Sequence, residues 1–193
     1  MQIPTRQITL LLVVVALQSS AQTGRPAQSA PYFIPMGSLS ARVPAGAASG
    51  SWLPYTTGGL SFTMPTTLPM ISCFVGGEVG ILVPRNGGYD IQAIHTEFGI
   101  KADLFRSGRK FGISPVAGLS STMVGIHEGR LDIQLHTFRN VENEYGLFAG
   151  LSAWYRWKRI EVRLPVYVDR VLSFPQRFTT VVTRLQLGYR VQR

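Results

Sequence analysis

The chain has 193 residues, which is enough for one domain of ordinary size. Hydrophobic residues make up 45% of the chain and charged residues only 15%, which is too apolar for an intrinsically disordered protein and sparing in charge for a soluble enzyme. The formal net charge is +9, but the arginines are dispersed along the chain, which argues against nucleic-acid binding and favours attraction to anionic lipid headgroups or lipopolysaccharide.

The first residues have the pattern of a secretory signal peptide. Arg6 precedes an apolar run over 8–17, and small or polar residues follow as far as Ala21. This run is only about half of the 20 or so apolar residues that a membrane-spanning helix needs. We therefore expect a signal peptide over 1–21, cleaved after Ala21. Residues 22–30 are rich in Gly, Ala, Ser, Pro and Gln and are expected to form a flexible leader, which leaves 31–193 for one barrel domain.

Beyond the leader, apolar and polar residues alternate with a period of two, which is the pattern of β-strands with two different faces. The alternation is poor in the first two segments and clear in the others. It predicts eight strands, over 32–43, 52–64, 71–83, 94–106, 111–121, 145–157, 160–169 and 181–192.

The later segments show the two faces best. In 145–157 the polar face contains small residues and one misfit, Phe148. In 160–169, Leu164 and its apolar partners lie opposite Arg163, and in 181–192, Leu187 lies opposite Arg184. Each of these strands therefore has one face suited to an apolar environment and one suited to water.

The long segment over 124–144 has two interpretations. Leu131, Ile133 and Leu135 alternate with polar residues. The segment is either a hairpin that projects past the membrane or a genuine strand that replaces the weak first one. Both interpretations keep the total at eight strands.

Three features favour a barrel embedded in lipid over a soluble lipocalin-like barrel. The apolar face of each strand is nearly unbroken for about ten residues, the length that crosses a bilayer when tilted. Aromatic residues of that face gather near one rim, as in an interfacial girdle: Phe62, Phe111, Tyr155, Trp157 and Tyr189. The opposite face carries charges of both signs, which we expect to form a charge network in the lumen: Glu78, Glu97, Lys101, Asp103, Arg156, Glu161, Arg163, Asp169, Arg184 and Arg190.

Backbone hydrogen bonding then predicts closure of the sheet. In hydrocarbon every peptide group must be paired within the protein, so the expected fold is all-β, an antiparallel up-and-down transmembrane β-barrel of the outer membrane. An even number of strands brings both termini to the periplasm. Short periplasmic turns are expected at 65–69, 107–108 and 158–159, and longer outer loops at 84–90, 124–144 and 172–177.

The run over 71–119 resembles the PorT-like outer-membrane β-barrel family. It contains a Gly-interrupted strand (GGEVGILV), a short Gly-bearing loop (PRNGGYD) and a hairpin (EFGIKADLFRSGRKFGISPVAGL), and the ending LGYRVQR is similar to the finish of such chains. Many members end on an aromatic residue that the barrel-assembly machinery recognises, whereas this chain ends on Arg193. The resemblance implies a small outer-membrane barrel and transfers no catalytic residue.

The sequence offers few residues for catalysis or metal binding. Cys73 stands alone, and the histidines at 95, 127 and 136 lack the spacing of a metal site, so neither a metal nor a cofactor is expected. His95 and Glu97 share the polar face, which we interpret as part of a hydrogen-bonded lumen network. GGEVG lacks the Gly-Lys-Ser/Thr of a phosphate loop.

The predicted function is that of a non-enzymatic barrel with a side-chain-filled lumen, in a structural, surface-interaction or envelope-accessory role. Its expected partners are outer-membrane lipid, lipopolysaccharide, the barrel-assembly machinery and an unidentified envelope protein, with no nucleic acid. One alternative is a lipid-modifying enzyme at the outer rim that uses Ser120 or Ser121 with His127 and Glu128. The other is a soluble periplasmic ligand-binding barrel.

Overall fold

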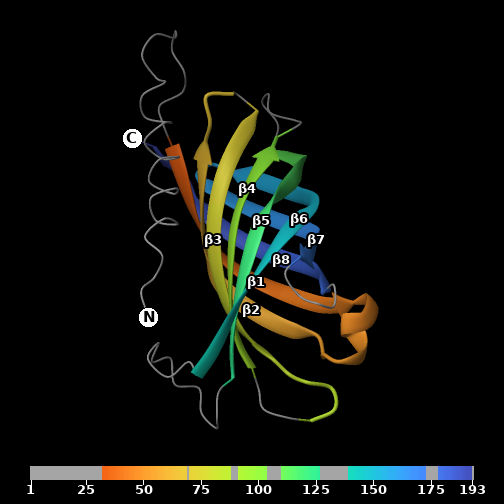
Figure 1. The fold of residues 1–193 in the computed structure, drawn as a ribbon. Coiled ribbons are helices and arrows are strands. Elements are labelled where there is room, and N and C mark those ends of the chain that lie inside the picture. Colours follow the sequence, from red (N-terminus) through yellow and green to blue (C-terminus); the bar gives the residue numbers. More distant parts are fainter. Residues whose placement is uncertain are drawn as a thin grey trace.

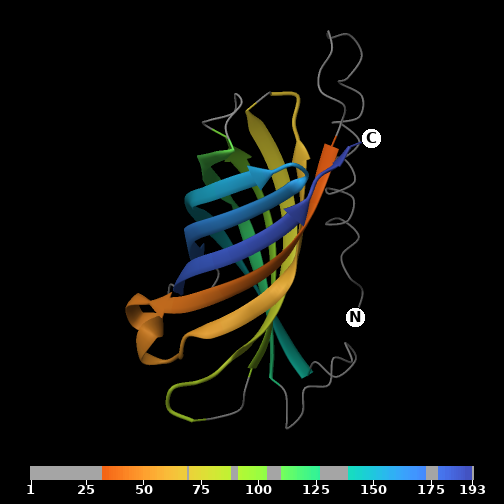
Figure 2. The same ribbon diagram turned by 180° about the vertical axis from the view of Figure 1, so that it is seen from behind.

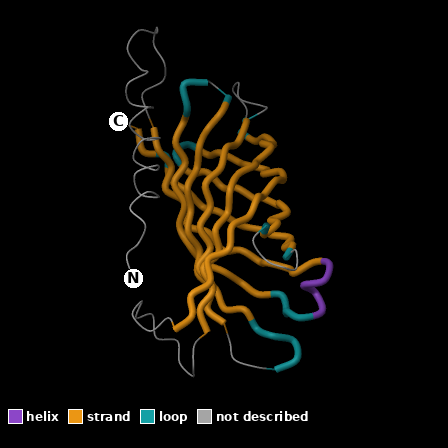
Figure 3. The backbone as a smooth tube through the Cα atoms, viewed as in Figure 1, coloured by secondary structure: helices purple, strands orange, loops and turns teal. Residues whose placement is uncertain are grey.

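The computed structural model describes residues 32–68, 70–87, 91–103, 110–126, 139–172 and 178–192. These residues form a barrel of antiparallel strands with a single short helix (Figures 1 and 3). The strands are β1 (Tyr32–Ala45), β2 (Tyr55–Pro65), β3 (Ile71–Leu82), β4 (Ile91–Ala102), β5 (Phe111–Ile126), β6 (Arg139–Trp157), β7 (Ile160–Val171), β8 (Thr179–Tyr189) and the two-residue β9 (Val191–Gln192); the 3-10 helix η1 spans Gly46–Gly50.

The sheet closes on itself through the first and last long strands. Each of β1 to β7 pairs with the next strand in sequence, and β8 returns to pair with β1, where Met36 lies opposite Gly188. The short β9 continues in the same register, with Tyr32 opposite Gln192. It therefore extends β8 past a break at Arg190, and the predicted closed, eight-stranded, up-and-down barrel is confirmed.

Several strand bounds differ from the sequence prediction. β2 begins at Tyr55 instead of 52, because η1 occupies the preceding turn and Trp52 forms only an isolated bridge with Pro84. β4 spans 91–102 instead of 94–106. β5 and β6 are longer than predicted, since Ile126 still pairs with Arg139. The extra residues, 122–126 of β5 and 139–144 of β6, do not alternate between apolar and polar in the sequence. Beyond the membrane both faces of a strand can be solvated, so no such alternation is required there.

The structure resolves part of the choice left open for 124–144. Tyr32–Ala45 is a genuine strand that closes the barrel, so no strand from this segment is needed to complete eight. β5 and β6 continue as a two-stranded hairpin into the segment. Leu131, Ile133 and Leu135 lie outside the described residues, as do the predicted signal peptide, the leader over 22–30 and the turn at 107–108.

The two ends of the barrel differ. The end where β1 begins and β8 finishes, which we call the turn end, has the tight connections after β2 and β6, and Lys158 adopts a left-handed φ of 55° in the second of them. The opposite end, the loop end, carries η1, the connection after β3 and the extended ends of β5 and β6 (Figures 1 and 2). Within the described part of the chain, no helix is long and apolar enough to cross a membrane.

The outer and inner faces of the barrel wall have opposite chemistry. On β8, Leu187 is 61% exposed on the outside, whereas Arg184 is 3% exposed and points into the lumen. Leu164 and Arg163 on β7 are arranged in the same way. Most charged residues of the described strands therefore lie inside, with Arg170 near the loop end of β7 as an exception, and an apolar surface faces outward, as lipid requires.

Candidate functional site inside the barrel

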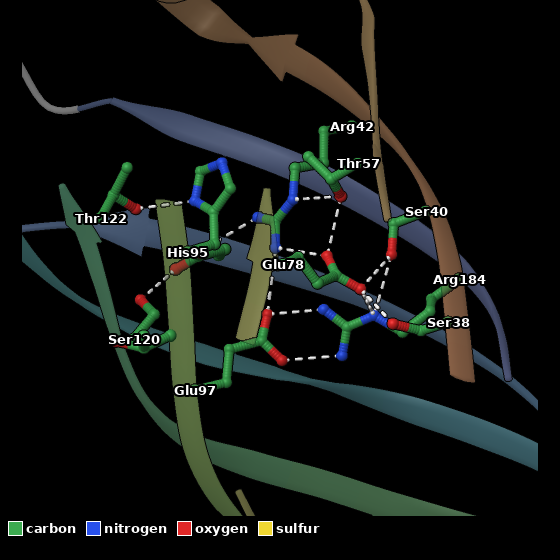
Figure 4. Close-up of polar contacts among 12 residues, drawn as sticks. Ser38, Ser40, Arg42, Thr57, Glu78, His95, Glu97, Ser120, Thr122 and Arg184 are labelled. Atoms are coloured by element: carbon green, nitrogen blue, oxygen red, sulfur yellow. Dashed lines mark hydrogen bonds and ion pairs between the residues drawn. The ribbon is translucent and has the colours of Figure 1, made fainter. Parts of the chain in front are cut away.

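Five buried charged residues meet across the middle of the lumen. We call them the central network: Arg42 from β1, Glu78 from β3, Glu97 from β4, Asp169 from β7 and Arg184 from β8. Figure 4 labels Arg42, Glu78, Glu97 and Arg184. Their strands come from different parts of the barrel wall, and β4 and β8 lie on opposite sides of the ring. The network therefore crosses the lumen instead of running along one wall.

Arg184 is the best-paired member. Its Nη1 and Nη2 donate to Glu97 Oε2 and Oε1, both at 2.8 Å, which is the bidentate geometry that makes an arginine–carboxylate pair strong. Its Nε also lies 2.7 Å from Glu78 Oε1. One guanidinium thus joins β8 to both β3 and β4.

Arg42 holds the same carboxylates from the neighbouring strand. Its Nη2 lies 3.1 Å from both Glu78 Oε2 and Glu97 Oε1, and its Nη1 lies 3.6 Å from Asp169 Oδ2. The side chain of Arg42 is 1% exposed. A charge so deeply buried is tolerated only when it is paired, as it is here.

Hydroxyl groups complete the pairing of each carboxylate. Glu78 accepts from Ser38, Ser40 and Thr57 at 2.7–2.9 Å. Tyr167 Oη donates to Glu97 Oε1 at 2.5 Å, and Ser120 Oγ donates to Asp169 Oδ1 at 2.6 Å. These donors come from the wall itself, so each carboxylate of the network has at least one hydroxyl partner.

Three aromatic rings form a layer next to the central network on its turn-end side. Phe148 lies between Phe74 and Tyr167, with ring centroids 5.9 and 5.2 Å away. Phe148 is 3% exposed, so the apparent misfit of the sequence pattern is a lumen-filling residue. Gly99 makes room for the layer, because an added Cβ would lie 2.8 Å from both the Phe74 and the Phe148 ring and 2.7 Å from a backbone oxygen.

A second charge cluster lies between this layer and the turn end. We call it the turn-side network: Lys101, Asp103, Arg156, Glu161 and Arg163. Glu161 accepts from Arg156 Nη2 at 2.8 Å and from Arg163 Nε at 2.5 Å. Asp103 accepts from Ser114 at 2.6 Å but lies 3.7 Å from Arg163 Nη2. Fewer wall hydroxyls donate to these carboxylates than to those of the central network, and Arg163 Nη1 is buried without a hydrogen-bond partner among the described residues.

The loop-end side of the lumen is filled by His95 and apolar residues. The two ring nitrogens of His95 lie 3.2 Å from Tyr55 Oη and 2.9 Å from Thr122 Oγ1. Tyr55 packs with Leu82 and Ala93, and Trp52 covers them. His95 is thus a hydrogen-bonded interior residue next to Glu97.

All ten predicted lumen residues project to the inner side of the wall, and they divide between the two networks, apart from Arg190. That residue lies at the turn end, where its guanidinium stacks 3.9 Å from the Tyr32 ring. The five predicted aromatics are exposed on the outside close to the turn end, where Phe111 faces Tyr155 and Trp157 faces Ile160 across the strands.

Sequence reasoning missed Arg42, the second arginine of the central network. Every second residue of β1 points inward, so Ser40 and Arg42 share the inner face with Ile34 and Met36. Because two large apolar residues occupy that face, the alternation looks broken. The Ser-x-Ser-x-Arg spacing from Ser38 to Arg42 was the available signal.

The two serines of the alternative enzyme hypothesis lie on opposite faces of the barrel wall. Ser120 points into the lumen, where it binds Asp169, whereas Ser121 is on the other face, with its hydroxyl 2.6 Å from Asn143 Oδ1. His127, Glu128 and His136 lie outside the described residues.

Comparison with known proteins identifies the fold and no sequence family. No protein-family model matches the chain, and no curated protein matches its sequence. The structure is similar to Neisserial surface protein A, with a TM-score of 0.59 and 13% identity over 83% of this chain and 97% of that one. It is also similar to Ail, the attachment invasion locus protein of Yersinia pestis, solved in complex with the heparin analogue sucrose octasulfate (TM-score 0.54, 9% identity, 85% and 100% covered).

A third similar structure is the outer membrane protein OprG from Pseudomonas aeruginosa, with a TM-score of 0.52 and 13% identity over 87% of this chain and 99% of that one. At such low identity the shared property is the fold. Together with the apolar outer surface, the fold makes this chain a small β-barrel of the outer-membrane type.

Proposed function

We propose that this barrel is a closed, non-enzymatic outer-membrane protein that acts at its loop end, in a surface-interaction or envelope-accessory role. The observation that carries the proposal is the central network, because its arginine–carboxylate pairs span the lumen from β8 and β1 to β4. A protein that conducted solutes would have to open these pairs, and breaking a buried pair is costly.

The aromatic layer closes the lumen a second time. Phe74, Phe148 and Tyr167 come from β3, β6 and β7 and pack against one another. An eight-stranded barrel has room for little beyond its own side chains. These two layers support a barrel that anchors the chain and does not serve as a pore.

The loop end is the part best placed to meet a partner. The β6–β7 register ends at Gly146, and the last described backbone hydrogen bond on that side joins Leu172 N to Tyr145 O, so residues 139–144 pair with β5 and stand beyond the neighbouring wall. The outward-facing Arg170 and the exposed Arg85 lie near the same end. Their charge fits the phosphates of lipopolysaccharide, which we propose as a partner together with the surrounding lipid, the barrel-assembly machinery and an envelope protein.

The motifs over 71–119 support a finer assignment, to the PorT-like barrels, as part of this proposal. In the structure they correspond to β3, β4 and the first half of β5, three consecutive strands of one wall. That assignment implies an accessory role in the cell envelope, in keeping with a closed lumen.

Planar-bilayer recording tests the closure directly. We expect the refolded protein to show no conductance of porin size, because both layers block the lumen. The variant Glu97→Ala/Arg184→Ala removes the bidentate pair that crosses the lumen. We expect it to show a higher residual conductance than the unmodified protein. Porin-sized conductance in the unmodified protein would contradict the proposal.

Lipopolysaccharide binding tests the role of the loop end. The protein is reconstituted in phospholipid nanodiscs with and without lipopolysaccharide, and its unfolding temperature is measured. We expect lipopolysaccharide to raise this temperature, and Arg170→Gln to reduce the rise. The control Arg159→Gln removes an exposed arginine at the turn end and should leave the rise intact. Equal rises in all three proteins would exclude this contact.

A further inference from the structure

A small cavity lies inside the barrel between the aromatic layer and the turn-side network. Its volume is about 20 Å³, and its lining includes Phe148, Thr63, Lys101, Ser152 and Arg163. A polar cavity of this size holds one water molecule or one monatomic ion. It is therefore a candidate binding site that is separate from the loop end.

The lining of the cavity has one sign of charge. Lys101, Arg163 and Arg184 all border it, and none of the described lining residues is Asp or Glu. Arg184 is already paired with Glu78 and Glu97 of the central network. Lys101 and Arg163 belong to the turn-side network, in which three cations share the two carboxylates of Asp103 and Glu161. The excess positive charge therefore lies beside the cavity.

The same wall carries hydrogen-bond donors without partners. Ser152 Oγ and Arg163 Nη1 are buried and have no hydrogen-bond partner among the described residues. The side chain of Ser152 is 1% exposed and that of Arg163 is 2% exposed, so bulk water does not reach them. Unsatisfied buried donors of this kind are rare and mark a missing partner.

Lys101 adds further donors to the same site. Its Nζ donates to Thr63 Oγ1 at 2.8 Å, and the ring of Phe74 lies 5.9 Å from it. An ammonium group has three donors, of which this hydrogen bond uses one. A ligand that accepts hydrogen bonds from several directions and carries negative charge would satisfy the ammonium, the guanidinium and the hydroxyl together.

We infer that the cavity binds a monatomic anion of the halide class, with chloride as the physiological ion. Such an ion accepts hydrogen bonds on all sides, fits the volume and neutralises the excess positive charge of the turn-side network. A water molecule would fit the volume but would leave that charge uncompensated. The larger oxyanions, such as sulfate, are excluded by size.

Bromide is the probe. The protein is refolded at equal ionic strength in sodium chloride, sodium bromide or sodium gluconate, and the temperature at which the folded band converts to the unfolded one is read by gel electrophoresis. We expect both halides to raise this temperature over gluconate, by roughly 5 °C when the halide is at about 100 times its Kd. Crystals grown in bromide should show an anomalous peak beside Ser152 and Arg163.

Two variants tie the effect to the cavity. Lys101→Met removes the ammonium, and Ser152→Ala removes only the unpartnered hydroxyl, so Ser152→Ala decides the matter if Lys101→Met does not fold. We expect each to lose most of the halide effect, whereas Lys110→Met, an exposed lysine near the turn end, should keep it. Equal conversion temperatures in all three salts, or a halide effect that survives Ser152→Ala unchanged, would overturn the inference and leave the closed lumen unaffected.

Discussion

The two charge networks inside the barrel use the same residue types and are paired to different degrees. In the central network Glu78 and Glu97 accept from arginines and from hydroxyls of the wall, and Asp169 accepts from Ser120 and lies 3.6 Å from Arg42 Nη1. In the turn-side network Asp103 and Arg163 are 3.7 Å apart, and Arg163 Nη1 has no partner among the described residues. The difference lies in the number of wall hydroxyls: five donate to the central carboxylates, whereas among the described residues only Ser114 donates to a carboxylate of the turn-side network.

The largest expected effect comes from removing one charge from each network. Glu97→Gln leaves Arg184 without its bidentate partner and should lower the free energy of unfolding by about 3–5 kcal/mol. Asp103→Asn, the matched change in the turn-side network, keeps the partner Ser114 and should cost only about 1 kcal/mol. Urea unfolding followed by tryptophan fluorescence measures both. Equal losses would show that the two networks do not differ in the way described.

The double variant Glu97→Met/Arg184→Met refines the same comparison. Replacing both members of a buried pair by apolar residues is often nearly neutral. We expect much of the loss seen with Glu97→Gln to be recovered, although Tyr167 also loses two contacts. If the double variant were as unstable as Glu97→Gln, the loss of stability would come from removing the ion pair itself and not from leaving Arg184 buried without its partner.

An intermediate effect is expected at the layer that separates the networks. Gly99→Ala pushes a methyl group against Phe74, Phe148 and a backbone oxygen and should cost about 1–3 kcal/mol. Gly37→Ala is the control, because Gly37 is in a strand but has no atom within 4 Å of an added Cβ. It should unfold at the same urea concentration as the unmodified protein. If both variants behaved alike, the rings would have room to move.

The smallest expected effect is the loss of one hydroxyl. Tyr167→Phe keeps the ring of the aromatic layer but removes the group that donates to Glu97 and accepts from Arg184, which should cost about 1–2 kcal/mol. Tyr155→Phe, at an exposed aromatic of the turn-end rim, should cost much less. A negligible loss in Tyr167→Phe would indicate that the arginines alone hold Glu97.

The sequence predicts the faces of a strand well where its inner positions are all polar or small. This holds around Arg163 on β7 and Arg184 on β8, whose neighbours Leu164, Leu185 and Leu187 lie on the outer face. It fails for β1, because Ile34 and Met36 point inward beside Arg42. The lumen accommodates apolar side chains near the turn end. The residues of β1 therefore still alternate between the inner and outer faces, but both faces carry apolar residues there.

The partners of the predicted charges could not be deduced from the sequence. Arg184 and Glu97 are 87 positions apart, and their meeting depends on the stagger of all the strands between them. Alternation shows which side of the wall a residue occupies but not its height along the barrel. That height decides which of the two networks each predicted lumen residue joins, Arg190 joining neither, and it places the aromatic layer between them.

The cross-lumen bridge has a consequence for assembly of the chain. Its members come from the first, third, fourth, seventh and eighth strands, so the ion pairs that join Arg184 of β8 to Glu78 and Glu97 need the sheet to curl until its two edges approach. Before β8 meets β1, the guanidinium groups and carboxylates have no complete set of partners and favour water over a dry interior. Ring closure and neutralisation of the interior therefore occur in one step, which disfavours half-built barrels within the bilayer.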